Sequence, residues 1–201
     1  HRGEHLFIQG PSGSGKTTLL NLLTGINLPT VGAIAVLGTE LTALSNSQRD
    51  QLRADYLGVI FQQFNLLPYL SLLENVQLPC DFSKVKKGKC GDVRTTSKQL
   101  LSRLGLEESL LNQPVSKLSV GQQQRAAVAR ALIGSPEIVI ADEPTSALDS
   151  QNRDRFLDLL FQETKEQGST LIFVSHDEHI ARQFEHVVQL DQVNAAGNDA
   201  S

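Results

Sequence analysis

The sequence lacks methionine and tryptophan, and it holds only two cysteines among its 201 residues. Cys80 and Cys90 stand in a polar, lysine-rich stretch, which predicts neither a disulfide framework nor a zinc site and fits a reducing, cytosolic setting. Long hydrophobic runs are absent too: those at residues 138–141 and 171–174 have the length of strands, whereas a transmembrane helix needs about 20 residues. No secretory signal is present. We therefore expect a cytoplasmic chain without a membrane-spanning segment.

An excess of basic residues is missing as well. Lysine and arginine number 18 against 22 aspartate and glutamate, which gives a formal net charge of −4. Proteins that bind nucleic acids usually carry clustered positive charge, so no nucleic acid is expected as a partner. The length suits one large domain or two small lobes, and the composition is that of an ordinary globular protein. Because the chain starts at His1 and has no methionine, we expect a fragment or a processed form.

What the sequence does contain is a phosphate-binding loop at residues 10–17, where GPSGSGKT matches the pattern G-x-x-x-x-G-K-[ST]. The glycines let backbone N–H groups turn toward an anion, Lys16 suits the β- and γ-phosphates, and the Thr17 hydroxyl suits Mg²⁺. An accidental glycine-rich turn is the alternative, but average residue frequencies give this pattern by chance in under ~1% of such chains. A strand at residues 5–9 and a helix at 17–24 frame the loop, so the positive end of the helix faces the phosphates. The sequence therefore predicts a nucleoside triphosphate site. Its expected binding residues are Gly10, Ser12, Gly13, Ser14, Gly15, Lys16, Thr17 and Thr18.

The remaining pattern predicts an α/β fold with a mainly parallel sheet. Apolar runs indicate further strands at residues 32–37, 56–61, 137–142 and 169–175. An amphipathic helix at 152–167 separates the last two, and strand–helix–strand order favours parallel pairing. Further helices are expected at 47–55, 98–106 and 119–134.

Residues 64–128 differ in composition from the rest of the chain and predict a mostly helical subdomain inserted into this core. Leucines and two prolines at 65–79 are followed by a lysine-rich stretch at 83–98. That stretch is read as a solvated loop or a polar helix face, with a membrane-surface or partner role as the alternative. We expect one domain over 1–201: a core at 1–63 and 129–191, a helical subdomain at 64–128, and a polar tail at 192–201.

Two adjacent carboxylates, Asp142 and Glu143, end the predicted strand at 137–142. Successive side chains of a strand point to opposite faces, so the two can do different work. Asp142 can hold Mg²⁺, and Glu143 can orient or deprotonate the attacking water. Acidic residues often begin turns, which is the plain alternative. The phosphate loop favours the functional interpretation, because ligands of such sheets bind at the carboxyl ends of the strands.

A second anion-binding helix start is predicted at Ser119. Ser119 and Gln122 fit the capping-box pattern, which alone explains the serine but not Gly121 or the run of glutamines. A helix N-terminus with glycine also attracts anions. One nucleotide does not need two γ-phosphate sites in one chain, but two chains that face each other would use both.

These motifs together closely resemble the nucleotide-binding domain of ATP-binding cassette (ABC) transporters. The resemblance covers residues 3 to about 190. The motifs follow in the order of the family: GPSGSGKT, Gln62 in VIFQQFNLLP, LSVGQQQR at 118–125, IVIADE at 138–143, SALD at 146–149, and His176 in VSH. The segments at 57–68 and 74–79 are similar to ATPases of the macrolide-efflux, lipoprotein-release and cell-division complexes. The resemblance implies a P-loop NTPase with a RecA-like core.

The resemblance also implies an ATPase that powers a transporter by nucleotide-driven dimerisation. Its cofactors would be ATP and Mg²⁺, and its partners a second copy of the domain and an integral membrane permease subunit at the inner face of the cell membrane. Ser119, Gly121 and Gln122 would contact the nucleotide of the opposite chain, and Asp149 would communicate across the dimer. His176 would touch the γ-phosphate, and Gln62 would approach Mg²⁺ and the water. The implied catalytic residues are Glu143, His176 and Gln62, and the implied metal ligands are Thr17, Gln62 and Asp142.

Two departures from the family pattern stand out. Val120 replaces a commoner glycine, which a negative φ tolerates, so retained function is expected. Family members usually carry a strand and an adenine-stacking aromatic residue upstream of the position of Gly3, so we expect an incomplete adenine end and an unpaired strand edge.

Other functions remain open at this point. An ABC ATPase of DNA repair or chromosome organisation places a long coiled coil between phosphate loop and signature, whereas about 100 residues without sustained heptads lie here. An ATPase that signals across a membrane without transport would use the same site. A metal cluster of His176, His179 and His186 fits no zinc template, and a helix after His176 explains them better.

Overall fold

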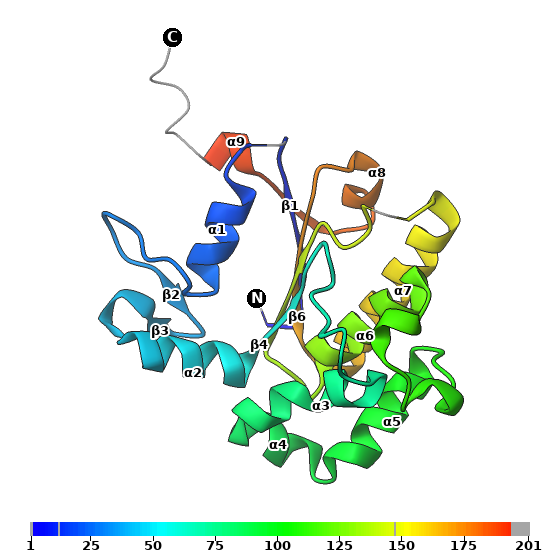
Figure 1. Cartoon of the computed structure of the whole chain (residues 1–201). Coiled ribbons are helices and arrows are strands. Elements are labelled where there is room, and N and C mark those ends of the chain that lie inside the picture. Colours follow the sequence, from blue (N-terminus) through cyan, green and yellow to red (C-terminus); the bar gives the residue numbers. More distant parts are fainter. Residues whose placement is uncertain (1, 12, 147, 194–201) are drawn as a thin grey trace.

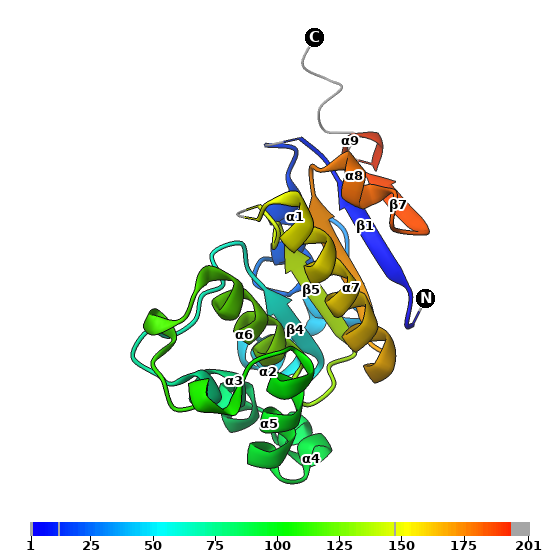
Figure 2. The same cartoon turned by 90° about the vertical axis from the view of Figure 1, so that its right-hand side faces the viewer.

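The computed structural model describes residues 2–11, 13–146 and 148–193. Five strands form one parallel sheet in the order β4-β5-β6-β1-β7 (Figure 2). The strands are β1 (His5–Gln9), β4 (Leu57–Ile60), β5 (Ile138–Asp142), β6 (Thr170–Ser175) and β7 (His186–Gln189). All carboxyl ends lie at one edge of the sheet, where the phosphate loop leaves β1.

Helices cover both faces of the sheet. They are α1 (Lys16–Leu23), α2 (Asn46–Tyr56), α3 (Leu72–Phe82), α4 (Lys84–Cys90), α5 (Val93–Arg103), α6 (Val120–Leu132), α7 (Ser150–Gln167), α8 (Glu178–Ala181) and α9 (Leu190–Val193). Figure 1 shows α1 on one side of the sheet and α6 and α7 on the other. Among the described residues, no helix is both long enough and apolar enough to cross a bilayer.

The buried strands explain why continuous apolar runs were informative. Phe7 packs in the cluster shared with α6 and α7, whereas Ile8 packs with Leu20 of α1 on the opposite face. In β5, Ala141 likewise lies in the cluster of Phe7, and Ile140 lies in the cluster of Ile8. Alternate residues thus fill two apolar layers, as expected for a sheet covered on both sides. The predicted strands at 5–9, 56–61, 137–142 and 169–175 are confirmed to within a residue or two.

The predicted strand at 32–37 is wrong in extent. Only β2 (Ala35–Val36) is extended there, and it pairs with β3 (Thr39–Glu40) in a small antiparallel hairpin. Leu37 and Gly38 link the two with φ of 52° and 75°. Two consecutive residues with positive φ make the tight turn of a hairpin, which ends the strand.

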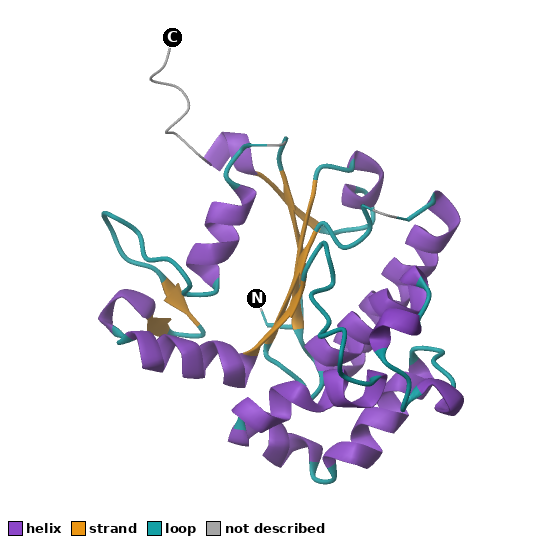
Figure 3. Cartoon of the chain, viewed as in Figure 1, coloured by secondary structure: helices purple, strands orange, loops and turns teal. Residues whose placement is uncertain are grey.

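Residues 70–132 form the helical part of the molecule, at one end of the sheet (Figure 3). The lysine-rich stretch is helical rather than a loop, because α4 and most of α5 occupy it, with side-chain caps from Ser83 and Asp92. The predicted division at 128/129 stays a proposal, since α6 runs through it and packs on both α3 and β4. Of the predicted tail, residues 192–193 belong to α9, and residues 194–201 lie outside the described part.

Candidate active site

The phosphate loop joins β1 to α1 through backbone conformations that favour glycine. Gly13 and Gly15 have φ of 84° and 94°. A Cβ on Gly10 would lie 2.5 Å from Ser14 Oγ, so the loop also closes tightly on itself. Lys16 Nζ donates to the carbonyl oxygens of Gly10 at 2.6 Å and Pro11 at 3.0 Å. The Lys16 side chain therefore folds back onto its own phosphate loop. Ser12 of this loop lies outside the described residues.

The carboxylate of Glu143 is the centre of a hydrogen-bonded cluster at the ends of β5 and β6. Ser175 Oγ donates to Oε2 at 3.0 Å, and His176 Nδ1 lies 2.9 Å from Oε1. Lys16 Nζ stands 3.8 Å from Oε1. Glu143 has a φ of 45°, which is unusual for a residue other than glycine and turns the chain sharply after β5. Neighbouring parallel strands thus bring together residues more than thirty positions apart.

Asp142 is the last residue of β5 and is half-buried beside Glu143. Burial raises the pKa of Asp142 above its usual value, the charge of Glu143 raises it further, and Lys16 acts in the opposite direction. A buried carboxylate of this kind is stabilised in its ionised form by a nearby cation. Oxygen ligands suit Mg²⁺, so Asp142 and the Thr17 hydroxyl fit that ion by their chemistry.

One cavity of about 470 Å³ gathers most of the predicted residues. Its lining is Gly13, Gly15, Lys16, Thr17, Thr18, Gln62, Asp142, Glu143, Ser146 and His176. Gln62 reaches it from the loop after β4, although this loop is far from the phosphate loop in sequence. All the residues predicted as catalytic or as metal ligands therefore share this cavity.

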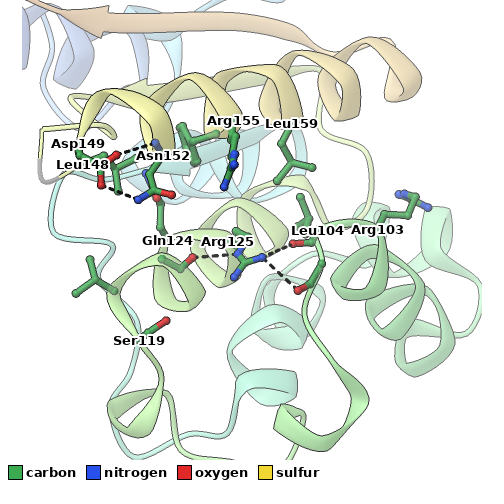
Figure 4. Close-up of a pocket in the computed structure, with 14 residues that line it drawn as sticks. Arg103, Leu104, Ser119, Gln124, Arg125, Leu148, Asp149, Asn152, Arg155 and Leu159 are labelled. Carbon is green, nitrogen blue, oxygen red and sulfur yellow. Dashed lines mark hydrogen bonds between the residues drawn. The ribbon is translucent and has the colours of Figure 1, made fainter.

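A second cavity of about 690 Å³ holds the other predicted group (Figure 4). Ser119, Gly121 and Asp149 line it, and it shares no lining residue with the first. Ser119 Oγ accepts from the Gln122 N–H at 3.3 Å, and the Gln122 side chain accepts from the Ser119 N–H at 2.8 Å. The capping box is thus formed, and the Gln122 side chain is used within it. Within one chain, the sequence-predicted site is divided between two places.

Asp149 is the N-cap residue that precedes α7, and it is exposed. Its carboxylate accepts from the backbone N–H of Asn152 at 2.9 Å and from the Asn152 side chain at 2.7 Å. These hydrogen bonds lower the pKa of Asp149 below its usual value. Its position in the described structure is that of a helix cap that faces the second cavity.

Sequence reasoning missed two polar side chains that hold the loops of the site. Buried Gln124 of α6 donates to the Pro144 carbonyl at 2.8 Å, one residue after Glu143. Arg130 donates to the carbonyls of Phe64 and Asn65, both at 2.6 Å, in the loop that carries Gln62. The run of glutamines was a signal for the first. Nothing local marked Arg130, because its partners lie more than sixty residues away.

The three described histidines near the C-terminus, His176, His179 and His186, make separate contacts. His176 faces Glu143, His186 Nε2 lies 3.4 Å from Glu4 Oε2, and the His179 N–H donates to Asp177. Within the described ranges, no group of three or more His, Cys, Asp or Glu side chains could hold a metal ion.

Comparisons with known proteins identify the family of the chain. The family model "ABC transporter" matches residues 1–146. An uncharacterized ABC transporter ATP-binding protein of Methanocaldococcus jannaschii, MJ0796, is 41% identical over 189 residues, which cover 94% of this chain and 80% of the relative. The macrolide export ATP-binding/permease protein MacB of Salmonella choleraesuis is 40% identical over 190 residues, 94% of this chain but 28% of that protein.

A solved structure extends the likeness to the fold. It is a dimeric, post-hydrolysis state of the cassette MJ0796 bound to ADP and Pi, with a TM-score of 0.83 and 39% identity over 94% of this chain and 82% of that one. The predicted P-loop NTPase fold, with a parallel sheet and attached helices, is confirmed by this match. The chain therefore belongs to the ABC transporter family, as an ATP-binding ATPase domain.

Proposed function

We propose that the chain hydrolyses Mg²⁺-ATP in the first cavity, with Glu143 as the general base, and that this cycle drives a membrane transporter. The observation that carries the proposal is the cluster around Glu143. Its carboxylate is held by Ser175 and His176 and lies 3.8 Å from Lys16. A base must be oriented by its neighbours and must stand beside the phosphate-binding groups, and both conditions are met by these contacts.

The residues of the phosphate loop bind and orient the triphosphate. Lys16 now donates to two carbonyl oxygens of its own loop, and phosphate oxygens offer stronger, charged acceptors for the same ammonium group. Thr17 and Asp142 supply the oxygen ligands for Mg²⁺, which neutralises phosphate charge when bound. The positive end of α1 favours the same anion.

Glu143 takes a proton from the attacking water, while His176 fixes the direction of the carboxylate. His176 is exposed and contacts Glu143 Oε1, so it reaches both the base and the space for the γ-phosphate. Gln62 lines the same cavity and can hold the water or Mg²⁺. Arg130 donates hydrogen bonds to the loop that carries Gln62. A partner that displaced this loop would therefore change the position of Gln62 in the site.

We infer that a second copy of the chain completes the site. The Ser119 end of α6 opens on its own cavity and shares no lining residue with the phosphate loop of the same chain. A helix N-terminus with a small, polar cap suits phosphate. Head-to-tail pairing would set Ser119 and Gly121 against the nucleotide of the partner. The dimeric state of the solved relative supports the presence of a second copy.

The membrane partner is proposed to act through a groove of about 420 Å³ between core and insert. Phe61, Pro79 and Phe82 give it apolar walls, and Phe82 is 68% exposed. Phe61 directly precedes Gln62, so a permease segment in the groove would move the Gln62 loop. Family membership favours such a partner, and the printed name of MacB joins ATP-binding and permease functions in one protein. The chain would then sit peripherally on the cytoplasmic face of the membrane.

Glu143→Gln tests the proposed function. The variant should bind ATP as the wild type does, lose hydrolysis by about 10²–10⁴-fold, and accumulate as a nucleotide-bound dimer. Glu108→Gln, an exposed change that removes the same charge, serves as the control and should leave the rate unchanged. Hydrolysis is measured by phosphate release, and dimers by light scattering with ATP. A wild-type rate in Glu143→Gln would refute the assignment of the base. Recovery of DNA but no membrane protein on affinity capture would refute the transporter partner.

A further inference from the structure

The two free cysteines lie side by side in the helical insert. Cys80 is buried near the end of α3, and Cys90 is the half-buried last residue of α4. Their sulfur atoms are 3.7 Å apart. A disulfide bond is about 2.05 Å long, so the sulfur atoms must approach by roughly 1.7 Å to become bonded. A change of side-chain rotamer covers a distance of this size.

The surroundings allow Cys90 to make that movement. Gly88 lies two residues before Cys90 and Gly91 directly after it, and a Cβ placed on either glycine would meet no atom within 4 Å apart from its own stretch of chain. Gly91 has a φ of 64°, which glycine adopts without strain, so the chain changes direction directly after α4. The Thr96 hydroxyl donates to the Cys90 carbonyl at 2.9 Å, which keeps the backbone in place while the side chain turns. Cys80, at 3% exposure, is fixed by its burial.

A small reagent can reach the pair from outside. A cavity of about 560 Å³ beside α3 and α4 has Cys80 in its wall, together with Lys87 and Arg94. Cys90 is partly exposed. We propose that Cys80 and Cys90 are the site of a reversible intramolecular disulfide, formed by exchange with a low-molecular-weight disulfide such as oxidised glutathione.

The exchange proceeds in two steps. The Cys90 thiolate attacks one sulfur of the reagent, RSSR, so that a Cys90–SR bond forms, the S–S bond breaks and one RS⁻ leaves. Cys80 then loses its proton, its sulfur attacks the Cys90 sulfur, and the second RS⁻ leaves. Both leaving thiolates take up protons. Two cysteine thiols are oxidised and one RSSR is reduced to two RSH, so electrons balance.

The order of attack follows from the environment of each thiol. Burial, together with the charge of Cys90 and its hydrogen bond, raises the pKa of Cys80 to about 12, so Cys80 is a poor first nucleophile. Once Cys90 is in a mixed disulfide, its own charge no longer opposes ionisation of Cys80. The short distance between the sulfur atoms then favours closure over a second external attack.

The disulfide would join the ends of α3 and α4 at a point that is also tied to the core. Buried Lys86 of α4 donates to the Leu57 carbonyl at the start of β4, at 2.7 Å. Ser83, between the two helices, donates to Asp55 of α2. The oxidised form is therefore an insert whose first two helices are linked covalently and held on the core.

The test equilibrates the folded, full-length chain in glutathione buffers of increasing oxidised fraction, followed by acid quench, alkylation and mass spectrometry of intact chain and peptides. The wild type should lose both free thiols, gain no glutathione, and recover both thiols in reduced glutathione. Cys80→Ser should carry one glutathione on Cys90, and Cys90→Ser should keep its buried thiol free. Circular dichroism checks that each variant is folded.

Three results on the wild type would overturn the proposal. They are a stable glutathione adduct on Cys90, two free thiols in fully oxidised buffer, or a disulfide that joins two chains. Formation of the bond only in urea would overturn it as well, because the geometry of the folded state would then play no part. Since these results need no variant, a variant that fails to fold leaves the test decisive.

Discussion

Arg103→Met measures how firmly the insert is tied to the core. Arg103 on α5 makes a forked contact with Glu163 on α7, with Nε 3.0 Å and 3.3 Å from the two carboxylate oxygens and Nη2 3.0 Å from one of them. The Glu163 side chain is only 2% exposed, whereas that of Arg103 is 46% exposed. The hydrogen bonds to Glu163 raise the pKa of Arg103 above its usual value. The pair therefore joins the buried carboxylate of Glu163 to the partly solvated guanidinium of Arg103.

The size of the effect follows from this asymmetry. Loss of one partner of a fully buried ion pair costs roughly 3–5 kcal/mol, because the other charge stays buried without compensation. Arg103 lies near the surface, so water screens the pair and partly replaces the guanidinium. We therefore expect Arg103→Met to lower the free energy of unfolding by about 2 kcal/mol. Lys98→Met, on the same helix, removes an exposed pair with Glu108 and should cost under ~1 kcal/mol.

Urea denaturation of the nucleotide-free chain separates these outcomes. With a slope of about 2 kcal/mol per molar, the Arg103→Met midpoint should fall by about 1 M. The double variant Arg103→Met/Glu163→Leu should regain at least half of the loss, because an apolar pair leaves no buried charge. Equal midpoints for Arg103→Met and Lys98→Met, or a double variant no more stable than the single one, would refute the reasoning.

Further predictions concern packing, pH and the loop beside the proposed base. Gly58→Ala puts a Cβ 2.1 Å from the Ala131 carbonyl oxygen, so Tm should fall by about 6–12 °C; an unchanged Tm would refute this contact. Burial lowers the pKa of Lys86 to about 8, so the folded state releases this proton at a lower pH than the unfolded state does. The free energy of unfolding of the wild type relative to that of Lys86→Met should therefore rise from pH 8 to 10.5. Urea titrations at several pH values would check this, and a constant difference would contradict it. Gln124→Leu leaves the Pro144 carbonyl unpaired, so kcat should fall more than KM for ATP rises in phosphate-release assays, and a change confined to KM would speak against it.

The sequence predicted those parts of the fold in which neighbours along the chain decide the outcome. Strands β5 and β6 are apolar throughout because both of their faces are covered, and that pattern needs no partner to be recognised. The start of α6 followed from Ser119 and Gln122, whose mutual hydrogen bonds are local. The phosphate loop was likewise predictable, since its glycines act through their own backbone angles.

Contacts between distant segments could not be predicted in the same way. Strand β7 was missed because HVVQ is short and half-exposed, and it becomes a strand only by pairing with β1. Lys86 was counted with the solvated lysines, yet it is buried because Gly134 lets α4 approach: a Cβ on Gly134 would lie 2.5 Å from Lys86 Cβ. The link from Glu143 to Ser175 and His176 depends on the order of strands, which no motif states.

The placement of Lys16 and Ser119 in separate cavities has a genetic consequence for the proposed head-to-tail pair. Chains with Lys16→Ala damage both sites of a pair of identical copies, and so do chains with Ser119→Ala. When the two kinds of chain are made in the same cell, a mixed pair collects both lesions in one site and leaves the other intact. Two inactive alleles would thus complement each other, with one functional site in every mixed pair, whereas two alleles altered in the same cavity would not.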